Sequence, residues 1–286
     1  MPSLVSIILP AFRARATIAR AVESLLRQSW EGWEAVIASD DGVDYLALLA
    51  DAGLRDERLR QVSTGAVGSG DGPARTCALQ AAQGDFVATL DADDAFAPDR
   101  LERLLPLARA GGAAVDNTQV IEEQGRPWKV PFPAATADFT MTAGDILGPR
   151  VPFFPVADRR FLPARWVAVP FCSDVLFNLE LLSACPRMTC CAASLYAYHK
   201  TAGSLTNSAA TAVRAEEGYR AILDLLERGE LALTPPIRAA ARAEFGENLR
   251  VNAIFARFVR EGRVATLEQF LDLTDNGKAA WLKDEA

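Results

Sequence analysis

Hydrophobic residues in the first hundred positions form short unbroken runs separated by segments with helical spacing. Unbroken apolar runs are typical of strands buried on both faces of a parallel sheet, and three occur here, at residues 4–9, 35–38 and 86–90. Between them, apolar residues recur every three or four positions, which predicts helices beginning at Ile18, Tyr45 and Pro73. The alternation predicts an α/β fold with a doubly wound, mostly parallel sheet flanked by helices.

The pattern changes further along the chain. A strand is expected at 113–115, and residues 122–139, which are rich in Pro, Gly and charge, predict an excursion or hairpin. From residue 213 onward Ala, Glu, Arg and Leu dominate with helical spacing, and Pro235 separates two helices. We therefore expect a catalytic domain at 1–210 and a C-terminal helical extension at 211–286.

Three carboxylates follow the third strand directly, in Asp91-Ala92-Asp93-Asp94. Open α/β sheets bind ligands at the carboxyl ends of their strands, and carboxylates this close repel one another unless a cation lies among them. One interpretation is a divalent metal, Mn²⁺ or Mg²⁺, shared with a phosphate. The other is a set of acids that favour the positive end of the following helix. The spacing alone leaves both open.

Composition narrows the choice of partners. The chain has 286 residues, half of them hydrophobic, and a formal net charge of −7. This acidic balance argues against nucleic acid as a partner. The five cysteines are odd in number and form no C-x-x-C pair, so we expect reduced thiols in a cytoplasmic protein, with the inner face of the membrane as an alternative location.

The stretch at 84–100 resembles the D-x-D region of family 2 glycosyltransferases, which have the GT-A fold and depend on nucleotide sugars. The opening Pro10-Ala11-Phe12 and the segment Asp40-Asp41-Gly42 also resemble that family, whose D-D-G-S contacts the nucleotide base. Arg75 stands where its A-R-N signature places an arginine beside the nucleotide. The resemblance implies that these residues, with Asp91 and Ala92, bind the donor.

The resemblance also implies roles for later residues. Asp93, with Asp94, would hold the metal, and His199, the single histidine of the chain, is the candidate for the family's metal-binding histidine. Asp174 would be the general base, with Ser173 in place of the glutamate that usually precedes it. Two further residues, Lys200 and Ser204, would contact the diphosphate.

The implied function is a metal-dependent, inverting glycosyltransferase of the hexosyltransferase type. It would move a sugar from a nucleoside diphosphate sugar, a UDP-sugar, to a hydroxyl of a saccharide or glycolipid in polysaccharide or glycolipid assembly. A nucleotidyltransferase is the first alternative, but it requires a glycine-rich loop after the first strand, and residues 10–15 contain no glycine. A non-catalytic sugar-nucleotide-binding protein is the second. The C-terminal helices would pack on the sheet, form a homodimer or associate with the membrane surface, and their mixed charges make the membrane the least favoured of the three.

Overall fold

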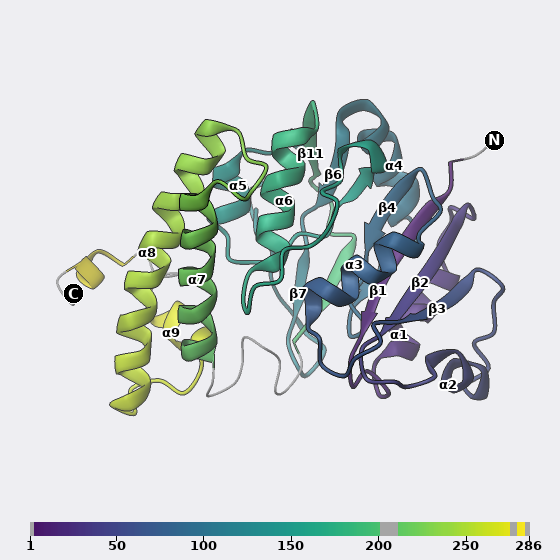
Figure 1. The fold of residues 1–286 in the computed structure, drawn as a ribbon, viewed down its shortest axis with the longest axis horizontal. Coiled ribbons are helices and arrows are strands. Elements are labelled where there is room, and N and C mark those ends of the chain that lie inside the picture. Colours follow the sequence, from purple (N-terminus) through teal and green to yellow (C-terminus); the bar gives the residue numbers. More distant parts are fainter. Residues whose placement is uncertain (1–2, 201–210, 275–278, 284–286) are drawn as a thin grey trace.

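The computed structural model describes residues 3–200, 211–274 and 279–283 (Figure 1). A large sheet runs through the molecule, with the strand order β3-β2-β1-β4-β10-β6-β11-β9. Its strands are β1 (Val5–Ala11), β2 (Trp33–Ser39), β3 (Leu59–Ser63), β4 (Phe86–Thr89), β6 (Gly112–Asp116), β9 (Phe139–Thr140), β10 (Val156–Asp158) and β11 (Arg187–Cys191).

The first four strands of this order run parallel, as the alternating pattern predicts. Val5 of β1 pairs with Trp33 of β2 on one side and with Phe86 of β4 on the other. The second half of the sheet is mixed, because β10 is antiparallel to both β4 and β6, while β11 is again parallel to β6. The predicted α/β sheet is therefore confirmed, with antiparallel strands that the sequence pattern did not predict.

Helices cover both faces of the sheet, so the central strands contribute to two cores. Ile7 and Leu9 of β1 pack with residues of α1 (Ile18–Leu26), α2 (Tyr45–Asp51) and α4 (Arg100–Gly111). The intervening Ile8 faces the opposite core, which includes α3 (Asp71–Ala81), α5 (Ala143–Leu147) and α6 (Ser173–Ala184). Because alternate residues point to opposite faces, both sets must be apolar, which explains the unbroken run in the sequence.

A small second sheet lies beside the acidic stretch. Its order is β5-β12-β7-β8, with β5 (Ala95–Phe96), β7 (Gln119–Ile121), β8 (Pro127–Lys129) and β12 (Tyr196–His199). The antiparallel pair β7–β8 forms the hairpin expected near residues 122–139. Pairing of β12 with β5 brings Tyr196 opposite Phe96, and so places β12 next to the acids that follow β4.

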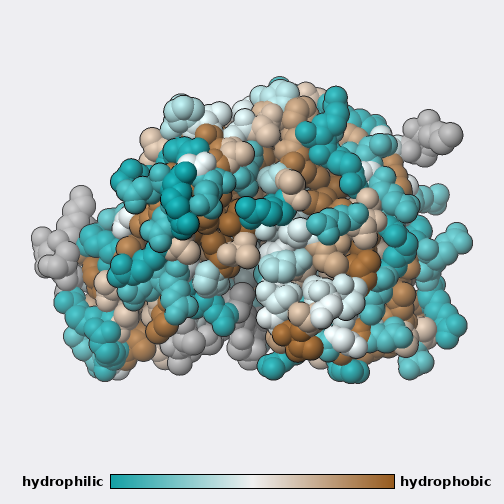
Figure 2. Space-filling model, viewed as in Figure 1, coloured by the Kyte–Doolittle hydropathy of each residue, from teal (hydrophilic) through white to brown (hydrophobic). Residues whose placement is uncertain are grey.

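The C-terminal region is helical, as expected, with α7 (Thr211–Arg228) and α8 (Pro235–Arg260) side by side in Figure 1, followed by α9 (Leu267–Leu273) and the short helix η2 (Ala280–Lys283). Tyr219 and Ile222 of α7 and Phe245 of α8 belong to the same hydrophobic core as α6. The extension is thus built into the core of the α/β region. Hydrophilic and hydrophobic residues are interspersed over the two helices in the view of Figure 2. No helix in the described part has both the length and the apolar character needed to cross a membrane.

Candidate active site

Asp40, directly after β2, anchors the glycine-rich loop. It is only 2% exposed, and its carboxylate accepts hydrogen bonds from the Thr64 hydroxyl (2.8 Å) and from the backbone N–H groups of Ser69 (3.1 Å) and Gly70 (3.0 Å). Burial raises the pKa of Asp40, but a hydrogen bond from the Ser69 hydroxyl together with these three outweighs it and leaves the pKa below its usual value. Asp40 therefore fixes the shape of the loop that precedes α3.

Asp41 fixes a second turn at the same edge. Its carboxylate accepts hydrogen bonds from the Arg13 backbone N–H (2.7 Å) and from the Tyr45 hydroxyl (2.8 Å). Arg13 has a left-handed φ of 54°, so this hydrogen bond supports a backbone conformation that non-glycine residues rarely adopt. The turn presents Phe12, which is 44% exposed and lies beside Gly68 of the anchored loop. An exposed aromatic ring thus stands between two fixed loops.

Among the residues predicted to contact the donor, Ala11 and Ala92 are 1% and 7% exposed. Each can reach a ligand mainly through its backbone. The Ala11 carbonyl accepts a hydrogen bond from the Asp40 N–H at 2.9 Å, while Pro10, just before it in β1, is partly exposed. Pro10, Ala11 and Ala92 therefore shape this edge of the sheet and supply no polar side chain to the site.

Arg75 lies at the centre of a cluster of carboxylates. Its Nη2 donates to Asp91 at 2.7 Å and its Nε to Asp71, one helical turn earlier, at 2.6 Å. Only 5% of the Arg75 side chain is exposed. Burial opposes the charge of the guanidinium, but Asp71, Asp91 and Asp174 outweigh it and raise the pKa of Arg75. A permanent cation is therefore held between the strand β4 and the helices α3 and α6.

Asp174, the predicted base, lies in the first turn of α6, near enough for its charge to act on Arg75. Burial raises the pKa of Asp174, Arg75 lowers it and Asp71 raises it, with a raised pKa as the result. Asp91 shows the same balance more strongly: burial raises its pKa to about 7, opposed by Arg75 and reinforced by Asp71, Asp93 and Asp174. The structure thus brings Asp91 and Asp174, which are far apart in the sequence, to one arginine.

Asp94 differs from its neighbours. It is fully buried, and its carboxylate accepts hydrogen bonds from the Tyr196 hydroxyl and the His199 backbone N–H, both at 2.7 Å. The Tyr196 hydroxyl in turn accepts the Asp91 N–H at 3.1 Å. Both carboxylate oxygens of Asp94 are thus engaged in tying β12 to the acidic turn. Asp94 as a metal ligand stays a prediction, and such a ligand would have to share a carboxylate that already accepts two hydrogen bonds from the protein.

The remaining metal candidates are Asp93 and His199. Asp93 is partly exposed, and its carbonyl accepts a hydrogen bond from the Arg20 guanidinium. Burial and the charge of Arg20 lower the pKa of His199 to about 4, so the imidazole is neutral at pH 7. Within the described residues, no three His, Cys, Asp or Glu side chains converge on one point. A cation here would need oxygen ligands from a substrate as well as from the protein.

Two residues were predicted to contact the diphosphate. The Lys200 ammonium lies 3.6 Å from the centre of the Trp128 ring on β8, in cation–π geometry. Ser204 lies outside the described residues, and the structure gives no account of it. Of the two residues predicted to contact the diphosphate, the structure therefore describes only Lys200, which follows His199 at the end of β12.

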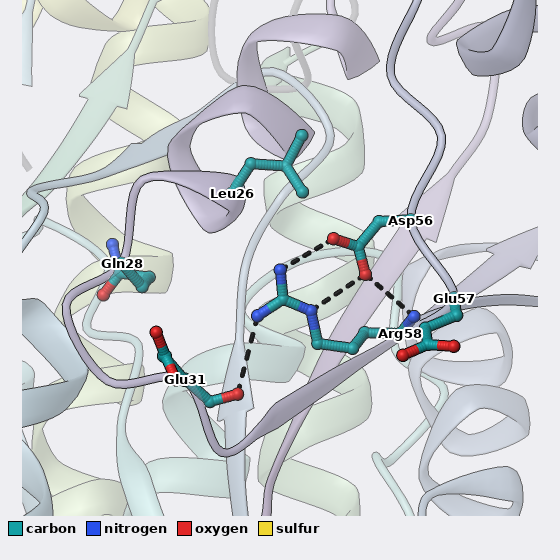
Figure 3. Close-up of a pocket in the computed structure, with 6 residues that line it drawn as sticks. All are labelled: Leu26, Gln28, Glu31, Asp56, Glu57 and Arg58. Atoms are coloured by element: carbon teal, nitrogen blue, oxygen red, sulfur yellow. Dashed lines mark hydrogen bonds and ion pairs between the residues drawn. The ribbon is translucent and has the colours of Figure 1, made fainter.

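A separate hollow of about 500 Å³ lies at the opposite edge of the sheet (Figure 3), lined by Leu26, Gln28, Glu31, Asp56, Glu57 and Arg58. These residues precede β2 and β3, whereas the acids described above follow the strands. Arg58 is neutralised there by Asp56 at 2.7 Å and lies over the Trp33 ring. The hollow carries no comparable chemistry.

Sequence reasoning did not identify Asp71, Ser173 or Tyr196 as parts of the site. For Asp71 a signal existed, because it lies four residues before Arg75 and a helix places such a pair on one face. The contacts of Ser173 and Tyr196 join segments about a hundred residues apart, and no local pattern indicates them.

Comparison with known proteins agrees with this architecture. The family model for glycosyl transferase family 2 matches residues 6–161. The succinoglycan biosynthesis protein ExoO of Rhizobium meliloti (strain 1021) is 30% identical over 218 residues, covering 71% of this chain and 62% of that protein. The Escherichia coli enzyme UDP-Glc:alpha-D-GlcNAc-diphosphoundecaprenol beta-1,3-glucosyltransferase WfgD is 35% identical over 99 residues, covering 35% of this chain and 38% of that protein. The chain thus spans less than two thirds of each of these relatives.

Solved structures share the fold over a longer stretch. Residues 1–349 of TarS from S. aureus, crystallised in complex with UDP-GlcNAc, match with a TM-score of 0.59 and 16% identity, covering 90% of this chain and 92% of that one. The match includes the fold beyond residue 161, where the family model ends. With the matched family model and the mixed α/β sheet, these findings establish that the chain belongs to glycosyl transferase family 2.

Proposed function

We propose that the chain transfers a sugar from a UDP-sugar to an acceptor hydroxyl with inversion at the anomeric carbon. The observation that carries this proposal is that Asp91 forms an ion pair with the buried guanidinium of Arg75 while Asp174 is near enough for its charge to act on the same guanidinium. One acid comes from the end of a sheet strand, where α/β folds bind nucleotides, and the other from the first turn of a separate helix. A donor and an acceptor can therefore meet between them.

The donor nucleotide would lie along the edge formed by β1, β2 and β4. Phe12 offers an exposed ring against which a base can stack, beside the loop that Asp40 fixes. Arg75 forms an ion pair with Asp91 of the acidic turn, and a diphosphate would replace part of that contact by one between Arg75 and phosphate oxygens. Lys200 and Ser204 are proposed to reach the diphosphate from beyond β12.

A divalent cation fits this donor set. Mg²⁺ and Mn²⁺ take oxygen ligands, and sites of this kind use one or two carboxylates together with substrate phosphates and water. Asp93 would hold the cation, with Asp91 close by. Burial raises the pKa of Asp91 most, and the neighbouring carboxylates Asp71, Asp93 and Asp174 add to the rise, so a cation here would relieve part of their repulsion. When bound, the cation would stabilise the negative charge that develops on the departing diphosphate. His199, with a neutral imidazole, is the remaining proposed ligand.

Asp174 is proposed as the general base. Its carboxylate would take the proton of the acceptor hydroxyl while that oxygen forms its bond to the anomeric carbon and the bond to the UDP oxygen breaks. The acceptor attacks from the side opposite the leaving group, so one displacement inverts the anomeric centre. The raised pKa of Asp174 makes its carboxylate a stronger base than an exposed aspartate. Arg75 opposes that rise.

The acceptor is proposed from the relatives. ExoO is named for succinoglycan biosynthesis, and WfgD is named for glucosyl transfer from UDP-Glc to a sugar on diphosphoundecaprenol. A growing saccharide or glycolipid in polysaccharide assembly is therefore the proposed acceptor, with the cytoplasm or the inner face of the membrane as the proposed site of action. The homodimer through the C-terminal helices stays a prediction, as does the division at residue 210.

A thermal-shift panel tests the donor class. UDP, GDP, ADP and CDP are added in turn to the protein, each with EDTA and with MnCl₂. By linkage, the nucleotide that the site binds raises the melting temperature, and more so when the cation bridges it to the protein. We expect the largest shift for UDP with Mn²⁺. Equal shifts for all four nucleotides, or none, would contradict the proposed donor.

Family membership leaves one alternative of a different class, a sugar-nucleotide-binding protein without catalysis. The nucleotidyltransferase alternative has no support from the family match. The binder is distinguished by turnover, since it would give the UDP shift but release no UDP from any UDP-sugar in the presence of acceptor.

A further inference from the structure

One carboxylate, that of Asp71, connects the two halves of the site. Asp71 is the first residue of α3, and its Oδ1 accepts from the Arg75 Nε at 2.6 Å. Its other oxygen, Oδ2, accepts from the Ser173 hydroxyl at 2.7 Å. Ser173 is the first residue of α6 and directly precedes Asp174. Asp71 therefore joins the arginine of the donor side to the turn that carries the proposed base.

The partners of Asp71 are buried, so both hydrogen bonds should contribute to stability more than exposed ones would. Arg75 exposes 5% of its side chain, Ser173 is 6% exposed, and Asp71 exposes 34% of its side chain. Hydrogen bonds to a charged group are stronger than neutral ones, and a buried donor that loses its acceptor bears the full cost of desolvation. Removing the carboxylate would leave the Ser173 hydroxyl without this acceptor. Arg75 would lose one of its two ion pairs with Asp71 and Asp91 and keep the one with Asp91.

The sequence around α6 points the same way. Ser173 stands where the family resemblance implies a glutamate, so α6 itself carries one carboxylate in its first turn, Asp174. The hydroxyl of Ser173 instead reaches a carboxylate on α3. We propose that Asp71 is a positioning residue that supplies from α3 the carboxylate missing at position 173, and so holds Arg75 and the first turn of α6 in register with each other. The effect of Asp71 on catalysis rests on the proposed function. Its connection of Arg75 to the first turn of α6 does not depend on that function.

Steady-state kinetics on the full chain test the catalytic consequence. Asp71→Ala and Ser173→Ala should each lower kcat for sugar transfer about tenfold, because each releases the turn that carries Asp174. The double variant should be no slower than Asp71→Ala, since both changes break one connection. Asp71→Ala should also weaken UDP binding through Arg75, whereas Ser173→Ala should leave the Kd for UDP unchanged.

A relocated carboxylate gives a sharper test. Ser173→Glu in the Asp71→Ala background should have a kcat at least about threefold higher than Asp71→Ala alone, because the new side chain restores a carboxylate beside Arg75 from α6. If Asp71→Ala fails to fold, Asp71→Asn keeps the size of the side chain and removes the charge. The matched control is Asp51→Ala at the exposed C-terminal end of α2, which should behave as wild type.

Hydrogen exchange at the amides of residues 173–176 separates this inference from the proposed function. Exchange in this turn should be about tenfold faster in Asp71→Ala and in Ser173→Ala than in wild type, and unchanged in Asp51→Ala. If the wild-type protein transfers no sugar, the proposed function is wrong. The exchange rates of residues 173–176 would still test whether Asp71 holds this turn. Unchanged exchange, or kinetic effects of the two substitutions that simply multiply in the double variant, would overturn the inference.

Discussion

Gly218 of α7 lies directly against Phe171, three residues before Asp174. A Cβ built on Gly218 would lie 2.6 Å from the Cβ of Phe171 and 3.0 Å from its backbone nitrogen. The next residue, Cys172, has a left-handed φ of 64°, and the Tyr219 ring packs edge-on against Phe171. The C-terminal helices thus press on the turn from which α6 begins, so they bear on the position of Asp174 as well as on the core.

Gly218→Ala, a substitution in α7, should therefore displace the turn from which α6 begins and so shift Asp174. The added methyl group meets backbone and Cβ atoms, which cannot move aside as a flexible side chain would, so we expect a loss of about 1–3 kcal/mol in the free energy of unfolding. The same displacement should lower kcat for transfer several-fold while changing the Kd for UDP little. Urea unfolding and steady-state kinetics on one preparation measure both effects.

Gly246→Ala is the matched control, since Gly246 lies inside α8 and a Cβ there would meet no atom within 4 Å. Alanine favours a helix interior over glycine by about 0.5–1 kcal/mol, so this variant should be slightly more stable and fully active. Equal behaviour of the two variants would show that the contact with Phe171 does not constrain the turn.

The sequence predicts a strand well where its hydrophobic pattern has only one interpretation. The runs at β1, β2 and β4 are apolar throughout because both faces of these strands are buried. Several strands were not predicted, and for three of them, β3, β10 and β11, the physical reason is clear. In β3, polar Arg60 and Gln61 face half-buried surroundings, β11 begins with an exposed arginine, and β10 is only three residues long within an aromatic stretch.

The site follows the same division. The positions after strands, Asp40 and Asp91, could be placed from sequence because strand ends meet at one edge of the sheet. What each carboxylate does could not, since Asp94 has the same local surroundings as Asp93 and yet is buried by Tyr196, about a hundred residues away. Side-chain partners across such distances are set by tertiary packing alone.

The pKa of Asp91 predicts an unusual dependence of stability on pH. Its pKa is about 7 in the folded chain, against an ordinary value of 3.8 for an aspartate. Between these values the folded state holds a proton that the unfolded state has lost, so ionising Asp91 costs stability as the pH rises through 7. Asp91→Asn, which mimics the protonated acid, should raise the melting temperature in EDTA by about 2 °C or more at pH 8 and much less at pH 5.

Asp51→Asn, at an exposed position of α2, serves as the control and should shift the melting temperature equally at the two pH values. A shift for Asp91→Asn that is the same at pH 5 and pH 8 would mean that Asp91 is ionised throughout, and that Arg75 dominates burial in setting its pKa.

Phe12 should matter for the nucleotide and little for folding, because it is 44% exposed. Stacking of a base on an aromatic ring contributes about 1–3 kcal/mol, so Phe12→Ala should weaken UDP binding about tenfold, and Phe12→Tyr should preserve it. Isothermal titration with UDP measures this. Val67→Ala, on the neighbouring loop and 75% exposed, should leave the Kd unchanged; an equal loss in both variants would count against a stacking role.

The most direct test of the account is Asp174→Asn, measured for UDP binding and for sugar transfer on the same preparation. The amide keeps the size of the side chain but cannot take a proton, so the rate of transfer should fall by about 10²–10⁴-fold while the Kd for UDP stays within a small factor of wild type. Transfer at the wild-type rate would show that Asp174 is not the base, and a parallel loss of UDP binding would show that it belongs to the donor site instead.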